Sequence, residues 1–338
     1  MSEADFTRLY DLAGHVMEST HPGMEVRFAT RYIDALACVI KSRQKKLSFR
    51  SPRSEKEWCA TMELQLNMPR VETICQLLDF IETPTHYYVV MERVEGVDLF
   101  EQTATEKLAP SDTREIMRQV LQGLQALHET GRIHRDLKLE NVVVDLEALH
   151  SPRNFLSTPS TTASLTTASP TANQASKIID FDTVQDWEPT SPKSREVLGT
   201  DGYIAPEAYG GAYSPASDIF AAGVMMYNLL TNSFPYHTDI FDDTPGKNWV
   251  GSPSMEKIRA RMQNCQIDFA CMDDVPVAAD LCARMLALDP MDRPSAEDAL
   301  THWWFKMSDE ELETGSLSPH SPCRSPVNRE KGRLYVEL

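Results

Sequence analysis

Two kinds of hydrophobic pattern divide the chain. Near its start, short runs rich in β-branched and aromatic residues predict strands: VRFATRYI and ACVIK within residues 26–41, and HYYVVMERV at 86–94. A polar, partly helical stretch around 54–68 separates them. From Ser111 onward, in SDTREIMRQVLQGLQALHETG, apolar residues recur at helical spacing, with Ser111 as the N-cap candidate and Gly131 as the stop. Further helices are expected at about 216–231, 276–287 and 295–304.

Two segments lack both patterns. The apolar runs Val142–Asp145 and Lys177–Asp180 are typical of partner strands, yet 31 residues, 146–176, lie between them and are rich in Ser, Thr, Pro and Ala. A segment of this length and composition has little apolar surface to bury, which favours disorder. The tail, 307–338, has three Ser-Pro pairs and a similar composition. We expect both segments to be disordered.

Size and charge narrow the classes of partner. The 338 residues are 41% hydrophobic, which is enough for a substantial core. The 50 acidic and 33 basic residues give a formal net charge of −17, which opposes binding to nucleic acid or an anionic membrane and favours basic partners. The basic run at 41–56 is therefore interpreted as a solvated loop, and no nucleic-acid partner is expected.

The cysteines and the apolar runs indicate in which cellular compartment the protein is expected. The seven cysteines are odd in number and form no Cys-x-x-Cys pair, which favours a reduced, intracellular protein, cytoplasmic or nuclear. The N-terminal sequence MSEADFTRLYDLAG is acidic and lacks the apolar region of a signal peptide. The longest apolar run, Ile219–Leu230, is too short to span a bilayer. We therefore expect neither export nor a membrane-spanning segment.

The string HRDLKLEN at 134–141 is the strongest chemical signal in the chain. It places a histidine, an arginine, two acids, a lysine and an amide between an expected helix and an expected strand. The string resembles the catalytic loop of the eukaryotic protein kinases, whose pattern is H-R-D-L-x-x-x-N. The resemblance implies that Asp136 accepts the proton of a substrate hydroxyl, that Lys138 steadies the γ-phosphoryl group and that Asn141 holds a magnesium ion.

A second metal motif of this family, D-F-G, is similar to DFD at 180–182. The resemblance implies that Asp180 binds magnesium and that Phe181 packs inward. Asp182 departs from the pattern. Glycine permits a positive φ at little cost, and aspartate is among the few other residues that tolerate one. An additional carboxylate beside a triphosphate would either repel it or help to hold a cation.

The resemblance extends to the nucleotide site. CVIK at 38–41 resembles V-A-I-K, which makes Lys41 the candidate phosphate-binding lysine. VVMERVEGVDLF resembles the family's hinge, with Met91 as gatekeeper and the adenine against the backbone of Glu92 and Val94. Asp98 is expected near the ribose or a substrate cation, although an exposed helix N-terminus is an equal alternative. The expected ATP-binding residues are Lys41, Val26, Val39, Met91, Glu92, Val94 and Asp98.

GTDGYIAPE at 199–207 resembles the end of the family's activation segment. Thr200 matches the threonine that contacts the catalytic aspartate and lysine in serine/threonine kinases, so the resemblance favours Ser/Thr over Tyr substrates. Glu207 and Arg293 match a buried structural ion pair of the family. Asp218 matches the residue that braces the catalytic loop.

Two parts of the family pattern are weak. Where a glycine-rich loop is expected, the chain has STHPGM with Gly23 as its one glycine, and Pro22 removes an N–H donor. The helical glutamate that should pair with Lys41 is not evident. Counting back from Pro69 leads to Cys59, with Glu57 and Glu63 nearby on different faces.

The resemblance thus implies a bilobal α+β protein kinase of the serine/threonine, calcium/calmodulin-dependent-kinase-like type that uses ATP and Mg²⁺ on protein substrates. Asp98 and Glu140 suggest basic residues beside the acceptor. Because the base and the metal ligands are present, an active kinase of reduced activity is preferred over a pseudokinase that acts as a binding or scaffold module. The expected ranges are an extension (1–9), a kinase domain (10–306, with lobes at about 10–94 and 95–306 and the insert 146–176) and a tail (307–338).

Overall fold

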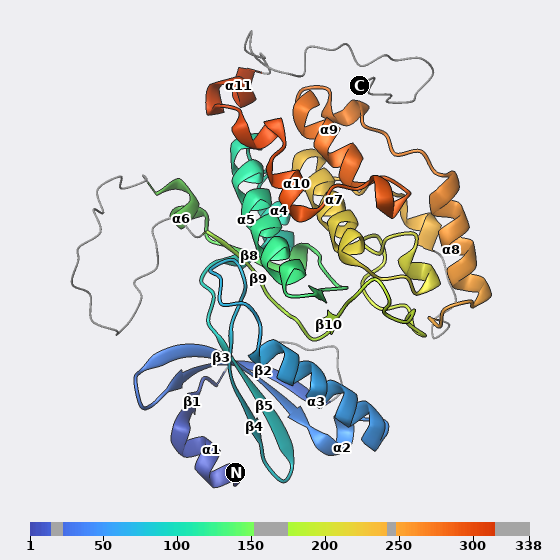
Figure 1. Ribbon diagram of the computed structural model, residues 1–338. Helices are drawn as coiled ribbons and strands as arrows, with labels where there is room; N and C mark the ends of the chain where they lie inside the picture. Colours follow the sequence, from blue (N-terminus) through green and yellow to red (C-terminus); the bar gives the residue numbers. More distant parts are fainter. Residues whose placement is uncertain (15–22, 152–174, 242–247, 315–338) are drawn as a thin grey trace.

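The structure, a computed structural model, describes residues 1–14, 23–151, 175–241 and 248–314. Figure 1 shows a smaller lobe, built on a β-sheet, and a larger helical lobe. The strands are β1 (Tyr10–Leu12), β2 (Met24–Arg31), β3 (Leu36–Gln44), β4 (Leu77–Glu82), β5 (His86–Glu92), β6 (Val97–Asp98), β7 (Arg132–Ile133), β8 (Val142–Val144), β9 (Ser176–Ile178) and β10 (Gln185–Asp186). The α-helices are α1 (Glu3–Leu9), α2 (Lys45–Ser48), α3 (Pro52–Leu66), α4 (Leu99–Thr105), α5 (Pro110–Glu129), α6 (Leu146–His150), α7 (Pro215–Thr231), α8 (Pro253–Asn264), α9 (Pro276–Met285), α10 (Ala296–Leu300) and α11 (Asp309–Thr314).

The sheet of the smaller lobe has the order β1-β2-β3-β5-β4, with all neighbours antiparallel. Alternation along β3 assigns its side chains to two faces. Cys38 and Ile40 belong to a buried cluster with Phe6 of α1, whereas Lys41 and Arg43 alternate onto the opposite face. Arg43 lies over the ring of Trp58 in α3, which identifies that face as the one covered by α3. The phosphate-lysine candidate therefore lies beneath α3.

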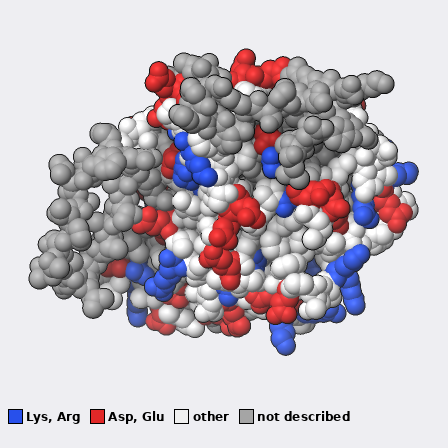
Figure 2. Space-filling view, turned by 45° about the horizontal axis from the view of Figure 1, so that its top comes forward, with Lys and Arg blue, Asp and Glu red and all other residues white. Residues whose placement is uncertain are grey.

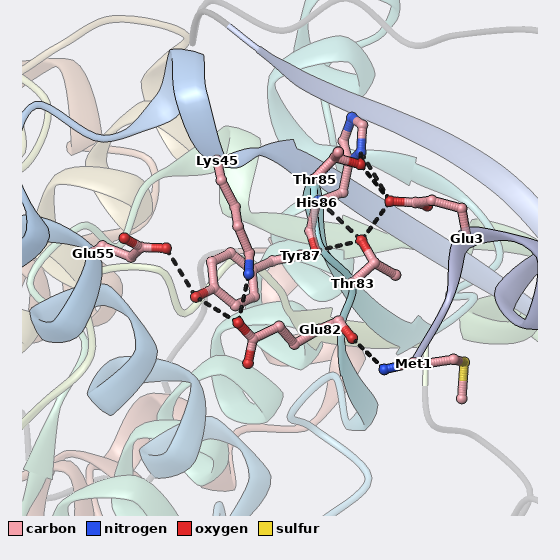
Figure 3. Close-up of polar contacts among 9 residues, drawn as sticks. All are labelled: Met1, Glu3, Lys45, Glu55, Glu82, Thr83, Thr85, His86 and Tyr87. Carbon is pink, nitrogen blue, oxygen red and sulfur yellow. Dashed lines mark hydrogen bonds and ion pairs between the residues drawn. The ribbon is translucent and has the colours of Figure 1, made fainter.

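Residues 1–9, expected to be an extension, are part of this lobe. Phe6 is 1% exposed and stacks on Tyr88 with ring centroids 3.7 Å apart. The carboxylate of Glu3 accepts hydrogen bonds from the hydroxyls of Thr83, at 2.5 Å, and Thr85 (Figure 3). It also accepts one from the Tyr88 hydroxyl at 2.7 Å. The sequence prediction missed α1 because the helix has one short apolar face, which is buried only by packing on the sheet of this lobe.

The larger lobe is organised around α5 and α7. Most of α7 is buried, and α5 packs against α7, α10 and β9. The expected N-cap of α5 is wrong: the helix begins at Pro110 after Ala109, without a side-chain cap, because proline suits the first turn of a helix. The expected stop is confirmed, since Gly131 follows the helix with φ +70°. Among the described residues, no helix combines the length and the apolar character that crossing a membrane requires.

The expected insert and tail are both shorter than predicted. Residues 146–150 form α6, and Ala175 and Ser176 are buried at the start of β9, so the insert 146–176 is partly folded at both ends. Its middle, 152–174, lies outside the described residues. The tail begins with α11, and Arg114 of α5 donates to the Met307 carbonyl at 2.5 Å and pairs with Asp309. Disorder from 307 is therefore wrong for residues 307–312, and 315–338 lie outside the described residues.

Backbone contacts join the lobes beside β9. Cys75 N donates to the Ile178 carbonyl at 2.8 Å, and Ile178 N donates to the Thr73 carbonyl at 2.9 Å. In α3, the Gln65 side chain donates to the Phe181 carbonyl at 2.9 Å. The segment after β9 is thus held from both lobes, next to Lys41.

Candidate active site

The pairing of β8 with β9 brings two candidate metal ligands together. The strands run antiparallel with Val142 opposite Ile178, so the residue before β8 and the residues after β9 lie at the same end. Ile179 N donates to the Asn141 carbonyl at 2.8 Å, which extends the ladder. β9 ends at Ile178, two residues earlier than expected for Lys177–Asp180. Asp180, with φ +60°, leaves the strand in a left-handed conformation next to Asn141.

Three polar side chains form a chain of hydrogen bonds around Asp136. The Thr200 hydroxyl donates to Asp136 Oδ1 at 2.9 Å, and Lys138 Nζ donates to Thr200 Oγ1 at 2.9 Å. Lys138 Nζ also lies 3.7 Å from Asp136 Oδ2. The Asn141 amide donates to the backbone carbonyl of Asp136 at 2.8 Å. A carboxylate, an ammonium group and a hydroxyl are thus positioned together, and the carboxylate and ammonium groups are about one-fifth exposed to solvent.

Asp218 of α7 braces the loop that carries Asp136. Its carboxylate is 2% exposed and accepts from His134 N at 2.8 Å, Arg135 N at 2.9 Å and His128 Nε2 at 2.9 Å. Burial acts to raise the pKa of Asp218, but the hydrogen bond from His128 and the charges of neighbouring histidines outweigh it and lower the pKa. The brace holds Arg135 at φ +71°, a strained conformation directly before Asp136.

Lys41 extends from β3 to the segment after β9. Its Nζ lies 2.5 Å from Asp180 Oδ1 and 3.8 Å from Asp182 Oδ2. Burial alone would lower the pKa of Lys41, but the two carboxylates outweigh it, so the pKa is raised and the lysine is charged. The structure therefore brings Lys41, predicted from one lobe, against Asp180, predicted from the other.

The helical acid expected beside Lys41 is not found in α3. Glu57 is exposed and pairs with Arg53 at 2.8 Å, and Glu63 is also exposed. Glu55 accepts from the Tyr87 hydroxyl at 2.9 Å. Within the described part of the chain, the acidic partners of Lys41 are Asp180 and Asp182.

The backbone argument made for Asp182 applies instead to Asp180. Asp180 has the positive φ, and Asp182 does not, so replacing the family's glycine imposes no left-handed strain at 182. Phe181 packs inward as expected: it is 4% exposed, and its ring centroid lies 4.8 Å from that of His134. The side chain of Asp180, the residue before Phe181, contacts Lys41.

The remaining nucleotide-site candidates surround β3 and β5. Val26 is the cross-strand partner of Lys41, Val39 pairs with Met91, and all three apolar side chains are half-buried. Glu92 ends β5, and its side chain pairs with Lys177 at 2.8 Å. Val94 lies just beyond β5 and is half-buried.

Two other candidates have different surroundings. Asp98 is the N-cap of α4 and accepts from Glu101 N at 2.8 Å, which fits the structural alternative considered for it. In the weak glycine segment, residues 15–22 lie outside the described residues. Gly23 follows them with φ +72°, and its carbonyl accepts from Gln44 N at 2.7 Å.

The structure confirms the expected ion pair between Glu207 and Arg293, and it also shows contacts that the sequence did not predict. Arg293, whose side chain is 0% exposed, contacts Glu207 at 2.7 and 2.8 Å. The sequence prediction missed Gln65 as the anchor of Phe181 and Lys177 as the partner of Glu92. A glutamine within a helix gives no sequence signal for a contact 116 residues away.

A comparison with protein-family models matches residues 28–305 to the family described as "Protein kinase domain". This match covers more than half of the chain, so the chain belongs to the protein kinase family. The bilobal protein kinase fold expected from the sequence is confirmed. The expected range, 10–306, contains the matched residues, and its exact limits stay a prediction.

Curated relatives agree with this assignment. The chain is 30% identical to calcium/calmodulin-dependent protein kinase type IV of Mus musculus over 246 residues, 71% of this chain and 44% of that protein. It is 29% identical to calcium-dependent protein kinase 4 of Plasmodium falciparum (isolate 3D7) over 240 residues, 69% of this chain and 38% of that protein. It is 27% identical to hormonally up-regulated neu tumor-associated kinase homolog B of Xenopus laevis over 295 residues, 86% of this chain and 39% of that protein. The chain spans less than half the length of these relatives.

Proposed function

We propose that this member of the protein kinase family is a serine/threonine kinase that transfers the γ-phosphoryl group of ATP to protein hydroxyls. The observation that supports it most is the hydrogen-bonded chain of Asp136, Thr200 and Lys138. In this proposal, Asp136 accepts the proton of the acceptor hydroxyl, and Lys138 neutralises charge on the transferred group. Phosphoryl transfer depends mainly on positioning and charge neutralisation, which such an arrangement supplies.

The donor set fits a magnesium ion bound together with a nucleotide. Mg²⁺ usually takes one or two carboxylates together with phosphate oxygens and waters. Asn141 and Asp180 adjoin at one end of the β8–β9 pair, and the Asn141 amide is oriented by its hydrogen bond to the Asp136 carbonyl. The described residues hold no group of three or more His, Cys, Asp or Glu side chains suited to a metal ion, which fits an ion that needs the phosphates. When bound, the ion would neutralise charge on the phosphates.

The ATP site that we propose follows from the same two lobes. Lys41 contributes a positive charge for the phosphates, and the half-buried side chains of Val26, Val39 and Met91 offer an apolar surface for the adenine. The backbone of Glu92 and Val94 would supply hydrogen bonds to its edge. Asp98 would contact the ribose or a basic substrate group through the oxygen that does not cap α4.

The test is transfer of labelled γ-phosphate from magnesium-ATP to a basic protein and to the chain itself. Asp136→Asn should lower the rate by about 10²- to 10⁴-fold, because the general base is lost while the shape is kept. Asp239→Asn, which changes an exposed carboxylate that pairs with His237, is the matched control and should leave the rate unchanged. Equal rates in the parent and Asp136→Asn would contradict the proposal.

A pseudokinase that acts as a binding or scaffold module is the second candidate. Asp180, the proposed metal ligand, is paired with Lys41, and Asp182 adds a second negative charge beside it. The Lys41–Asp180 pair would compete with the metal ion for Asp180, and the charge of Asp182 would repel a triphosphate unless Lys41 neutralises it. The base and both metal ligands are nevertheless present, and losing one of these is more severe than weakening a phosphate contact. We therefore prefer a kinase of reduced activity.

We propose substrates with basic residues beside the acceptor. Oε2 of Glu140 is buried and has no hydrogen-bond partner among the described residues, and a cationic side chain would supply one. A library of Ser/Thr peptides should show a preference for Lys or Arg near the acceptor, and Glu140→Gln should weaken that preference. Equal rates on neutral and basic peptides would contradict it.

The overall charge supports the same class of partner. On the face shown in Figure 2, acidic and basic side chains are interspersed, and the chain as a whole is strongly acidic. We propose that it does not act on nucleic acid. We also propose an intracellular location, cytoplasmic or nuclear, which is supported by six free cysteines among the described residues.

A further inference from the structure

The buried ammonium group of Lys41 requires a negatively charged partner, and Asp180 cannot be its only one if Asp180 also binds a metal ion. Its side chain is 14% exposed, so its ammonium group has lost most of its water. Asp180 satisfies it at 2.5 Å, but Asp180 is also the proposed metal ligand. When Asp180 turns to a metal ion, Lys41 needs a second acid to keep it oriented. Asp182 Oδ2, 3.8 Å from Nζ, is that acid in this structure.

Helix α3 does not supply the second acid. Figure 3 shows Glu55 hydrogen-bonded to Tyr87, whose hydroxyl also contacts Glu82, and Glu82 in turn pairs with Lys45. The Glu55 carboxylate therefore binds the β4–β5 hairpin rather than Lys41. Glu57 pairs with Arg53 at the exposed surface of the helix. Neither carboxylate is directed at Lys41.

The inner face of α3 is occupied by other residue types. Trp58, Met62 and Gln65 are spaced four and three residues apart, so they lie along one side of the helix. Met62 is 0% exposed, and Gln65 binds the Phe181 carbonyl. Trp58 packs with Arg43, whose Cζ lies 4.8 Å from the indole centroid. The middle of the face toward β3 is therefore filled by an aromatic, an apolar and a neutral polar side chain. The carboxylate on this side of the helix, Glu55, accepts from the Tyr87 hydroxyl at 2.9 Å instead of pairing with Lys41.

The backbone on both sides of Asp182 is fixed. Gln65 holds the Phe181 carbonyl at 2.9 Å. On the other side, Arg135 Nε donates to the Thr183 carbonyl at 2.7 Å, and the Thr183 hydroxyl donates to the His134 carbonyl at 2.7 Å. Contacts from both lobes thus fix the backbone on either side of Asp182, and from this backbone its carboxylate comes within 3.8 Å of Lys41 Nζ.

We infer that Asp182 is a positioning residue that orients Lys41 for the ATP phosphates, the part expected of an acid in α3. This inference rests on the proposed function, because it assigns Lys41 to the phosphates. The inference also explains why aspartate stands where the family has glycine. The motif then supplies one carboxylate, Asp180, for the metal ion and a second, Asp182, for Lys41. An acid at 182 and the binding of Glu55 to Tyr87 rather than to Lys41 then belong to one arrangement.

The test is a double-mutant cycle on the affinity for magnesium-ATP, measured by calorimetry on the parent, Asp182→Asn, Lys41→Met and the double variant. Asp182→Asn should raise the Kd about tenfold in the parent and have no effect in the Lys41→Met background, because Asp182 acts through Lys41. Glu57→Gln, which removes an exposed paired carboxylate of α3, should leave the Kd unchanged. Asp182→Glu should recover part of the loss.

Rates on the same proteins separate this inference from the proposed function. If transfer is absent but the cycle shows coupling, the kinase proposal fails and the role of Asp182 stands. If transfer depends on Asp136 but the effects of Lys41→Met and Asp182→Asn simply multiply, the role of Asp182 is wrong and the kinase proposal stands. Tighter nucleotide binding in Asp182→Asn would also overturn the inference. Should Asp182→Asn melt well below the parent, Asp182→Gly, the family's own residue, takes its place with the same expected loss.

Discussion

At the scale of single residues, Asp218 shows how one buried carboxylate organises a whole loop. It accepts two backbone N–H groups and a histidine N–H, and these contacts place Asp136 where Thr200 and Lys138 reach it. A buried acceptor of this kind satisfies donors that have no access to water. The stability of the loop and the geometry of the candidate base therefore depend on the same side chain.

Asp218→Ala should lower the free energy of unfolding by about 2–5 kcal/mol, because it leaves buried N–H groups of the loop without an acceptor. The measurement is urea unfolding monitored by tryptophan fluorescence. Asp186→Ala, which removes a largely exposed carboxylate, is the control and should change the free energy by less than about 0.5 kcal/mol. A small effect at 218 would contradict its role as a brace.

The sequence predicted the residues of the site better than their partners. Asp136, Lys138 and Asn141 lie within eight consecutive positions, so one motif fixes all three, and a strand pair brings Asp180 to them. The partners of Lys41 depend on which face of α3 packs against β3. The spacing of residues along the chain does not determine this rotation of the helix. Counting back from Pro69, which led to Cys59, therefore gave no indication of Asp182, whose Oδ2 lies 3.8 Å from Lys41 Nζ.

At the scale of elements, α1 shows that a short helix can be held by polar contacts as much as by apolar ones. Burial acts to raise the pKa of Glu3, but hydrogen bonds from Thr83, Thr85 and Tyr88 outweigh it and lower the pKa to about 2. The helix was not predicted because its anchor, the β4–β5 hairpin, lies about 80 residues away. A seven-residue helix is marginal by itself and depends on such an anchor.

Docking of α1 should depend on pH. Because the folded pKa of Glu3 is below its unfolded value of about 4.3, its contribution is complete above that value and is lost as pH falls toward 2. Hydrogen exchange in α1, corrected for intrinsic rates, should therefore accelerate relative to α7 as pH falls below 4. In Glu3→Gln, the amides of α1 should exchange rapidly at all pH values. Exchange in α1 that is unaffected both by the fall in pH and by Glu3→Gln would contradict this prediction.

At the scale of the whole molecule, two lobes meet through a small number of contacts around β9. Lys41 and Gln65 from the sheet lobe reach Asp180 and Phe181 in the helical lobe. A ligand that binds both lobes should therefore stabilise the assembled molecule. The two-lobe division was predictable from the change between the strand pattern that ends at 94 and the helical pattern that begins at 111. Helix α11 was not predictable, because its place depends on Arg114 of the distant α5.

Magnesium-ATP should raise the Tm by several degrees. At a concentration of 100 Kd, a ligand that binds only the native state adds about 2.7 kcal/mol to its stability. The measurement is a thermal melt with ATP and magnesium together, with each alone as the control. Lys41→Met should reduce the shift, and a Tm that is insensitive to magnesium-ATP would argue against a nucleotide site between the lobes.

The most direct test of the central claim is the identity of the phosphorylated acceptor. The parent chain, magnesium-ATP and matched peptides that differ only in a Ser, Thr or Tyr acceptor would be compared by mass spectrometry, beside Asp136→Asn. We predict phosphate on Ser and Thr, little on Tyr, and a loss of about 10²-fold or more in Asp136→Asn. No incorporation in any peptide or in the chain itself, or incorporation unchanged in Asp136→Asn, would contradict a serine/threonine kinase built on Asp136.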